Sequence, residues 1–159
     1  RSAFTSDESD NREFSIEVDP RTVDEDGIRH LASLGFNRLS LGIQDFDPIV
    51  QEAVNRAQTT DDVLNLVLAA RDSGFESISF DLIYGLPHQT VESFDRTLDL
   101  VIGMHPDRLA VYNYAHLPRR FKGQRMINDD DIPSPEVKLD ILHRTIDSLY
   151  PKRDHLIAE

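Results

Sequence analysis

The sequence contains no cysteine among its 159 residues. This absence excludes disulfide bonds and any thiolate metal site formed by this chain alone. Long apolar runs are also missing, because no stretch approaches the roughly 20 apolar residues that a membrane-spanning helix requires. A basic segment followed by an apolar one, as in an export signal, is not found either. We therefore expect a cytoplasmic protein that does not enter a membrane.

Basic residues are few compared with acidic ones. Lysine and arginine number 17 against 29 aspartate and glutamate residues, which gives a formal net charge of -12 at pH 7. Nucleic-acid binding proteins usually carry a basic face, so this balance argues against a nucleic-acid partner. The hydrophobic fraction of 39% is ordinary for a globular protein, and the length is enough for one domain with a buried core.

Several catalytic motifs are missing as well. The six histidines are scattered without the i, i+4 pairing that is typical of zinc sites on helices. The turn at residues 84–87 has one glycine and matches neither nucleotide-binding fingerprint. No Ser-His-Asp arrangement can be argued from the sequence. Metal hydrolysis, phosphate-loop chemistry and triad chemistry are therefore not indicated.

Apolar periodicity predicts strands that alternate with helices. Alternation with period 2 predicts strands at residues 14–18, 38–43, 77–82 and 108–114. Spacings of three and four predict five helices, at residues 23–34, 48–55, 60–73, 90–104 and 135–149. The expected N-caps include Asp47, Thr60, Thr90 and Ser134. The helix after Thr60 is apolar enough that we expect it to pack on more than one side.

The regions outside this pattern are polar. Residues 1–13 are expected to be a flexible lead-in, residues 119–132 a loop and residues 151–159 a tail, which leaves residues 14–150 as the domain. Within the domain one unit repeats after 39 residues: Gly35-Phe36 precedes the strand with Ser40, and Gly74-Phe75 precedes the strand with Ser79. Such βα repeats imply a parallel sheet, either doubly wound or part of a (β/α) barrel, with ligands at the C-terminal ends of the strands.

Polar residues stand at those C-terminal ends. They are Glu17, then Gln44 with Asp45, then Asp81, then residues 113–116. One such residue is commonly just solvated, but four in succession favour a rim that binds a small molecule. Asp81 lies in an apolar segment, and a buried carboxylate without a partner costs several kcal/mol. It therefore needs an amide nest, a basic side chain or a ligand. Arg56 is either a surface cation or a partner for a rim carboxylate, and His116 is interpreted as a loop residue.

Six blocks of the chain resemble the oxygen-independent coproporphyrinogen III oxidases, which are radical S-adenosylmethionine (SAM) enzymes. In order along the chain they are residues 15–20, 35–46, 54–56, 81–87, 113–118 and 132–142. Related haem chaperones share residues 37–42 and 83–87 but tend to differ at 17–20, 44–45 and 113–118, where this chain follows the oxidases. Two alternatives stay open, a fragment of such a haem chaperone and a self-standing α/β interaction domain.

The resemblance implies a partial (β/α) barrel of parallel strands, about strands three to six of a six-stranded barrel. It also implies that SAM contacts Glu17, Gln44, Arg56, Asp81 and Ala115. An arginine suits the carboxylate of SAM, and acids and an amide suit its ribose diol or its cationic groups. Ala115 would offer backbone groups or apolar contact.

The implied reaction is oxidative decarboxylation of coproporphyrinogen III to protoporphyrinogen IX in haem biosynthesis. In the family, a reduced 4Fe-4S cluster cleaves SAM to a 5'-deoxyadenosyl radical, which removes hydrogen from a propionate, and an electron donor is required. The cluster is held by three closely spaced cysteines that this chain lacks. A glycine-rich block and the family's C-terminal domain are also missing. We therefore expect an internal fragment that is catalytically inactive alone, with cluster ligands outside it.

Overall fold

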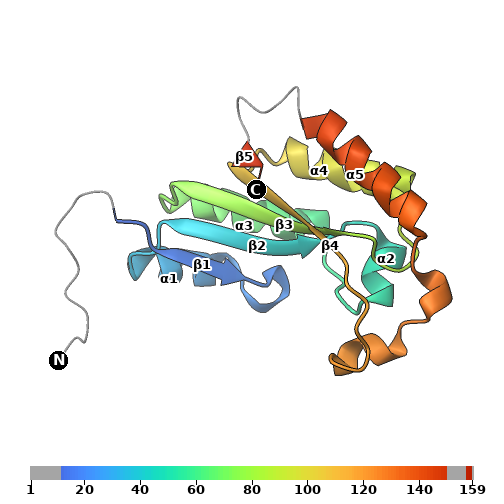
Figure 1. Ribbon diagram of the computed structural model, residues 1–159. Helices are drawn as coiled ribbons and strands as arrows, with labels where there is room; N and C mark the ends of the chain where they lie inside the picture. Colours follow the sequence, from blue (N-terminus) through green and yellow to red (C-terminus); the bar gives the residue numbers. More distant parts are fainter. Residues whose placement is uncertain (1–11, 150–156, 159) are drawn as a thin grey trace.

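A sheet of consecutive parallel strands organises the chain. The computed structural model describes residues 12–149 and 157–158. Five strands lie in the order β1-β2-β3-β4-β5, and every neighbouring pair is parallel (Figure 1). Their bounds are Ser15–Val18, Arg38–Gln44, Ser77–Tyr84, Arg108–Asn113 and Ile157–Ala158. Because the spatial order follows the chain without reversal, the sheet is part of a (β/α) barrel and not doubly wound.

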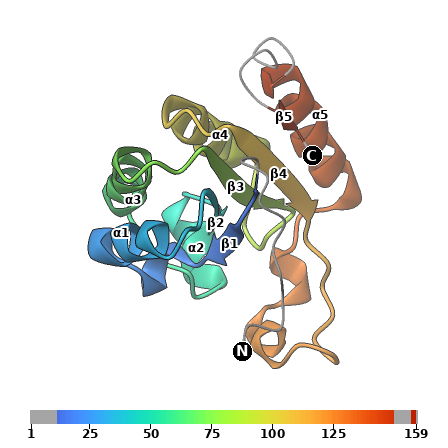
Figure 2. The ribbon, with the colours of Figure 1, turned by 90° about the vertical axis from the view of Figure 1, so that its left-hand side faces the viewer.

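Helices cover one face of this sheet. They are α1 (Glu25–Ser33), α2 (Pro48–Ala53), α3 (Thr60–Asp72), α4 (Val91–Gly103) and α5 (Pro135–Leu149). In the view along the sheet, α1, α3, α4 and α5 surround the outer face of a curved sheet (Figure 2), and α2 lies beyond the C-terminal ends of the strands (Figure 1). The predicted α/β partial barrel is confirmed.

The core lies between the outer face of the sheet and these helices. Alternate residues of β2 and β3 are fully buried there, namely Leu39, Leu41, Ile43, Ile78, Phe80 and Leu82. They pack in one cluster with helix residues such as Val67, Phe94 and Leu98. Burial of each such side chain is worth about 1.5–3 kcal/mol. The intervening residues of each strand face the opposite, inner side, so the polar positions of the strands share that face.

Most helix boundaries follow the predicted caps. Asp47 caps α2 with Pro48 at the first position, and Thr90 caps α4 through a capping box with Ser93. One cap prediction was wrong, because Thr59 and not Thr60 caps α3, accepting a hydrogen bond from the Asp62 amide at 3.1 Å. The expectation that α3 packs on more than one side is confirmed, because it contacts α1 as well as the core of the sheet.

The exposed side of α3 carries two leucines. The side chains of Leu64 and Leu68 are 38% and 54% exposed, while Val63, Leu66 and Val67 are buried. The helix belongs to the outermost layer of the fold, so only one of its faces meets the sheet (Figure 2). Its apolar composition alone did not reveal this, because apolar residues remain common on protein surfaces.

The regions expected to be irregular contain short elements. Pro20–Thr22 forms the 3-10 helix η1, and the predicted loop at 119–132 contains the 3-10 helices η2 (Lys122–Met126) and η3 (Asp129–Asp131). The prediction of a plain tail at 151–159 was wrong at Ile157–Ala158, which pair with β4 as a fifth strand. Residues 1–11 of the predicted lead-in lie outside the described residues.

The internal repeat is confirmed in the backbone. Gly35 and Gly74 end their helices with φ angles of 97° and 86°, in the left-handed region that favours glycine. The following phenylalanine amides donate to Leu31 and Ala70 carbonyls at 3.3 and 3.1 Å. Ser40 and Ser79 are then direct partners in the β2–β3 register. The repeat therefore delivers equivalent residues to the same level of the sheet.

Alanine at either repeat glycine is expected to destabilise the fold. A Cβ atom at Gly35 or Gly74 meets nothing within 4 Å, so the cost comes from the left-handed backbone alone, about 1–2 kcal/mol. Urea unfolding of Gly35→Ala and Gly74→Ala measures it. Gly103→Ala is the matched control, because it has equal space without a positive φ angle. Equal stability of all three variants would contradict this explanation.

Candidate functional site

Two hollows open beside the polar positions of the sheet. One, of about 240 Å³, lies on the inner face, and its lining includes Glu17, Arg38, Ser40, Ser79, Asp81 and Arg108. The other, of about 820 Å³, lies beyond the C-terminal ends of the strands, and its lining includes Gln44, Asn55, Arg56, Ile83, Tyr114 and Gln124. Four of the five predicted SAM-contacting residues therefore line one hollow or the other.

Glu17 and Asp81 share the inner-face hollow. Glu17 is the register partner of Ser40, and Asp81 is the partner of Gly42, on adjacent strands. The Ser40 hydroxyl donates to Asp81 Oδ2 at 3.0 Å. Asp81 is half-buried, so its carboxylate is less enclosed than its apolar neighbours in sequence suggest. A serine of the preceding strand thus supplies a partner that the sequence analysis did not name.

Gln44 and Arg56 share the larger hollow. Gln44 has a φ angle of 68°, a strained conformation for a residue other than glycine, at the point where the β2–β3 register shifts. Among the described residues, neither Gln44 Oε1 nor Arg56 Nε has a hydrogen-bond partner, although both atoms are buried. A Cβ atom on Gly42 would lie 3.1 Å from Gln44 Nε2 and 3.6 Å from Arg56 Nη2, so glycine leaves space for both. Buried polar atoms are normally paired. Arg38 Nε, Gln58 Oε1 and His116 Nε2 lack a hydrogen-bond partner too, but of these five described residues only Gln44 and Arg56 line this hollow, which makes it a candidate ligand site.

Arg56 forms an ion pair with the carboxylate of Asp19, the residue that follows β1. Its Nη2 atom lies 3.0 Å from Asp19 Oδ2 and donates to the Gly42 carbonyl at 3.2 Å. Burial lowers the pKa of Arg56, and the negative charges of Asp19 and Glu17 oppose that shift. Hydrogen bonding from Arg21, aided by the positive charge of Arg56, lowers the pKa of Asp19 to about 2. Asp19 is therefore ionised at neutral pH and keeps Arg56 in place.

Asp19→Asn is expected to lower the free energy of unfolding at pH 7 by about 1 kcal/mol, since a partly exposed ion pair is lost. Because folding lowers the pKa of Asp19, the carboxylate stabilises the wild type above pH 3.8, which is the pKa in the unfolded state. This contribution to stability is lost as pH falls toward 2. The gap between wild type and variant should therefore close over that range. Urea unfolding at several pH values measures this. A gap that widens toward acid pH would contradict it.

Ala115 lies at the margin of the larger hollow. It is exposed just after β4, and its carbonyl accepts a hydrogen bond from Gln124 Nε2 at 3.0 Å. The neighbouring Tyr114 amide donates to the Tyr84 carbonyl at 2.8 Å, which fixes this segment to the end of β3. Tyr114 and Gln124 line the hollow, whereas Ala115 itself is not among its lining residues. The Ala115 carbonyl is thus already paired within the chain.

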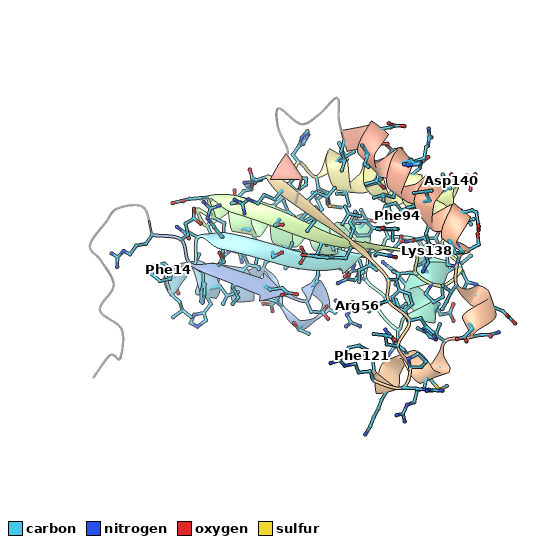
Figure 3. All side chains as sticks on the ribbon, viewed as in Figure 1. Phe14, Arg56, Phe94, Phe121, Lys138 and Asp140 are labelled. Carbon is cyan, nitrogen blue, oxygen red and sulfur yellow. The ribbon has the colours of Figure 1, made fainter. Side chains whose placement is uncertain are left out.

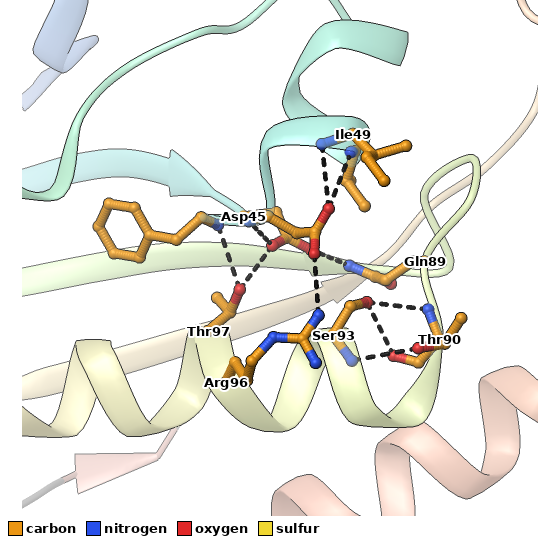
Figure 4. A network of polar contacts seen from close by, with 10 residues as sticks. Asp45, Ile49, Gln89, Thr90, Ser93, Arg96 and Thr97 are labelled. Carbon is orange, nitrogen blue, oxygen red and sulfur yellow. Dashed lines mark hydrogen bonds and ion pairs between the residues drawn. The ribbon is translucent and has the colours of Figure 1, made fainter.

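Asp45 does not belong to the rim, and this sequence interpretation was wrong. The residue is fully buried, and its carboxylate accepts from the Thr97 hydroxyl at 2.5 Å, the Gln89 amide at 2.5 Å and the Asp47 backbone at 2.8 Å (Figure 4). Burial raises the pKa of Asp45, and these hydrogen bonds oppose the shift. The left-handed backbone at Gln44 interrupts the alternation and turns the next side chain toward α4. The hydrogen bonds of Asp45 therefore link the start of α2 to α4.

His116 has structural contacts, as its interpretation as a loop residue suggests. Its Nδ1 atom lies 3.1 Å from the Tyr114 hydroxyl, and its Nε2 atom lies 2.9 Å from an oxygen of Asp129 in η3. Within residues 12–149 and 157–158, no group of three or more histidine, aspartate or glutamate residues could hold a metal ion. No helix in that part of the chain is long and apolar enough to cross a membrane.

Comparison with protein families gives one match that covers most of the chain. The model described as the radical SAM superfamily matches residues 2–101. The chain belongs to the radical SAM superfamily. Among radical SAM relatives, the oxygen-independent coproporphyrinogen III oxidase of Pseudomonas aeruginosa is 55% identical over 142 residues, covering 89% of this chain and 31% of the relative. That of Escherichia coli is 56% identical over 134 residues, covering 84% of this chain and 29% of the relative.

Solved radical SAM structures agree with the fold. Coproporphyrinogen III oxidase from Escherichia coli matches with a TM-score of 0.85 and 55% identity, covering 87% of this chain and 32% of that chain. Elp3 from Methanocaldococcus infernus matches with a TM-score of 0.77 but only 17% identity, covering 92% of this chain and 34% of that one, which supports the fold alone. The chain thus spans about a third of these proteins. The relatives named here give the haem-chaperone alternative no support.

The residues present fit one of the two cofactors of a radical SAM enzyme. A 4Fe-4S cluster needs thiolate ligands, and the chain has no cysteine, so its residues do not fit the cluster. SAM carries a carboxylate and several hydrogen-bonding groups, and the larger hollow presents a half-buried guanidinium and an amide with unpaired polar atoms. These residues fit SAM.

Proposed function

We propose that this chain is the SAM-holding part of an oxygen-independent coproporphyrinogen III oxidase. The observation that carries the proposal is the pair of buried, unpartnered polar atoms, Gln44 Oε1 and Arg56 Nε, at one hollow beyond the C-terminal strand ends. The names and the 55–56% identity of the oxidase relatives support it. When bound beside a reduced cluster held outside this chain, SAM supplies the radical that starts decarboxylation of the propionates.

Each residue has a role that its surroundings support. Arg56 offers a planar, charged donor group to the SAM carboxylate, and Asp19 fixes its direction. Gln44 offers an amide within the same hollow. Asp81 and Glu17 offer carboxylates to the ribose diol or the ammonium group from the inner face. Ala115 contributes its backbone at the edge of the adenine.

The remaining components of the reaction lie outside this chain. The substrate is coproporphyrinogen III, whose two reacting propionates become vinyl groups. An electron donor reduces the cluster. We place the reaction in the cytoplasm.

The test uses the product of the complete gene that encodes this chain, reconstituted with iron and sulfide without oxygen. With coproporphyrinogen III, SAM and a reductant, it should form protoporphyrinogen IX, which is detected after oxidation by its fluorescence. Haem binding without decarboxylation or SAM cleavage would contradict the proposal. The isolated 159-residue chain serves as the matched control and should not cleave SAM, because it lacks cluster ligands.

A further inference from the structure

Residues 117–127, here called the overhang, concentrate positive charge in an acidic chain. Arg119, Arg120, Lys122 and Arg125 are four of the 17 basic residues and lie within seven positions. All four are exposed. Within the described part of the chain none of them pairs with a carboxylate, and Arg125 Nε donates only to the Pro118 carbonyl at 3.2 Å. These cations are therefore available to an anionic ligand.

The same segment also presents apolar side chains to the larger hollow. Phe121 and Met126 are 53% and 91% exposed, and both line the hollow together with Ile127. Phe121 lies below the strand ends, on the same side as Arg56 (Figure 3). The hollow thus has one wall with Gln44 and Arg56 and another formed by the overhang. Large apolar side chains left this exposed beside a concave surface mark a ligand-binding surface.

Hydrogen bonds fix the overhang in this position. Gln124 Oε1 accepts from the Leu117 amide at 2.5 Å, and its Nε2 atom donates to the Ala115 carbonyl at 3.0 Å. The amides of Arg120 and Phe121 donate to the Leu117 carbonyl at 2.9 and 3.0 Å. The segment is therefore tied to the end of β4 before any ligand arrives, which reduces the entropy lost on binding.

We propose that the overhang binds the tetrapyrrole substrate, an inference that rests on the function proposed above. Phe121 and Met126 contact the apolar ring, and Arg119, Arg120 and Lys122 pair with its propionate carboxylates. A molecule with an apolar ring and four carboxylates matches a surface that combines apolar and cationic side chains. The acidic remainder of the chain repels such a polyanion, so the local cations decide where it docks.

The test replaces Arg119, Arg120 and Lys122 together with glutamine in the product of the complete gene. The probe is coproporphyrin III, the oxidised and unreactive counterpart with the same four carboxylates, titrated by fluorescence. Its dissociation constant should rise at least tenfold, and the KM for coproporphyrinogen III should rise with it. SAM affinity should not change, because Gln44 and Arg56 are untouched.

A matched control removes three exposed arginines elsewhere, at Arg29, Arg96 and Arg144, also by glutamine. It should bind the probe like wild type. In a second arm, Phe121→Ala should weaken binding of both coproporphyrin III and its tetramethyl ester, whereas the triple variant should weaken only the acid. Equal probe affinity in wild type and triple variant overturns the inference, as does a wild type that does not bind the probe. Probe binding that depends on the three cations without decarboxylation would contradict only the proposed function.

Discussion

Replacing Arg56 with alanine is expected to weaken SAM binding by about 10- to 150-fold in the product of the complete gene. The guanidinium is half-buried, already oriented by Asp19 at 3.0 Å, and has an unpaired Nε atom at the hollow. A hydrogen bond to a charged group is worth about 1.5–3 kcal/mol, and each 1.4 kcal/mol corresponds to a tenfold change in affinity. Equilibrium dialysis of SAM measures the change.

Two further variants separate charge from geometry at this site. Arg56→Lys keeps the charge but loses the planar fork, so its affinity should fall between those of wild type and Arg56→Ala. Asp81→Ala should cost about 1–3 kcal/mol of SAM binding if its carboxylate contacts the cofactor. Arg29→Ala, on the exposed side of α1, is the control and should bind as wild type does. Unchanged SAM affinity in both Arg56→Ala and Asp81→Ala would remove the site assignment.

Asp45→Ala is expected to lower the free energy of unfolding by about 3–5 kcal/mol. The change removes the acceptor of the buried Thr97 hydroxyl, of one N–H of Gln89 and of the part-buried Asp47 amide, although Gln89 Nε2 still donates to the Ile83 carbonyl (Figure 4). A buried donor left unsatisfied costs about 1–3 kcal/mol. Chemical denaturation measures it. Asp140→Ala, at an exposed position of α5, is the matched control and should change stability by less than about 0.5 kcal/mol. Equal effects of the two variants would contradict the structural role of Asp45.

The pH dependence of this effect has a defined sign. Because burial raises the pKa of Asp45, the stability that its carboxyl group contributes is largest below the pKa of the unfolded state. This stability is lost as pH rises through the pKa of the folded state. The stability difference between wild type and Asp45→Asn should therefore shrink from pH 4 toward neutrality. A difference that grows over this range would show that the three hydrogen bonds outweigh desolvation.

The regular elements were predictable because their signals are local. Asp47-Pro48 and Thr90 marked helix starts through side-chain caps, and Gly35 and Gly74 marked helix ends. Where two local choices were equal, as with Thr59 and Thr60, the sequence offered no way to choose. The two-residue strand β5 was missed because its definition depends on pairing with β4, and two residues show no periodicity.

The candidate site was predictable only in part, since its contacts join distant residues. Strand ends pointed to Glu17, Gln44 and Asp81, but the Ser40–Asp81 hydrogen bond spans 41 positions and required the register of the sheet. The position of Asp45 depended on the left-handed backbone of Gln44, which composition does not signal. Arg56 stayed open between a surface cation and a partner for a rim carboxylate, and Ala115 was one of several residues at the strand end 113–116, so only the family resemblance singled out these two as SAM contacts.

The binding role proposed for the overhang was likewise not predictable from the sequence alone. The sequence showed this segment as a polar loop, but the position of Phe121 and Met126 at the hollow is visible only in the fold, where Gln124 ties the segment to the end of β4. A polar sequence is expected of a surface loop whether or not the loop binds anything. The functional reading therefore depends on the apolar side chains that the fold places beside the cations.

The central claim is that SAM binds across the C-terminal ends of β1 to β4. The most direct test is a crystal structure of the product of the complete gene with SAM bound. We predict that the SAM carboxylate lies within hydrogen-bonding distance of Arg56 and that Gln44, Asp81 and the Ala115 backbone contact the same ligand. A SAM molecule bound elsewhere, with Gln44 and Arg56 still unpaired at the hollow, would contradict the account.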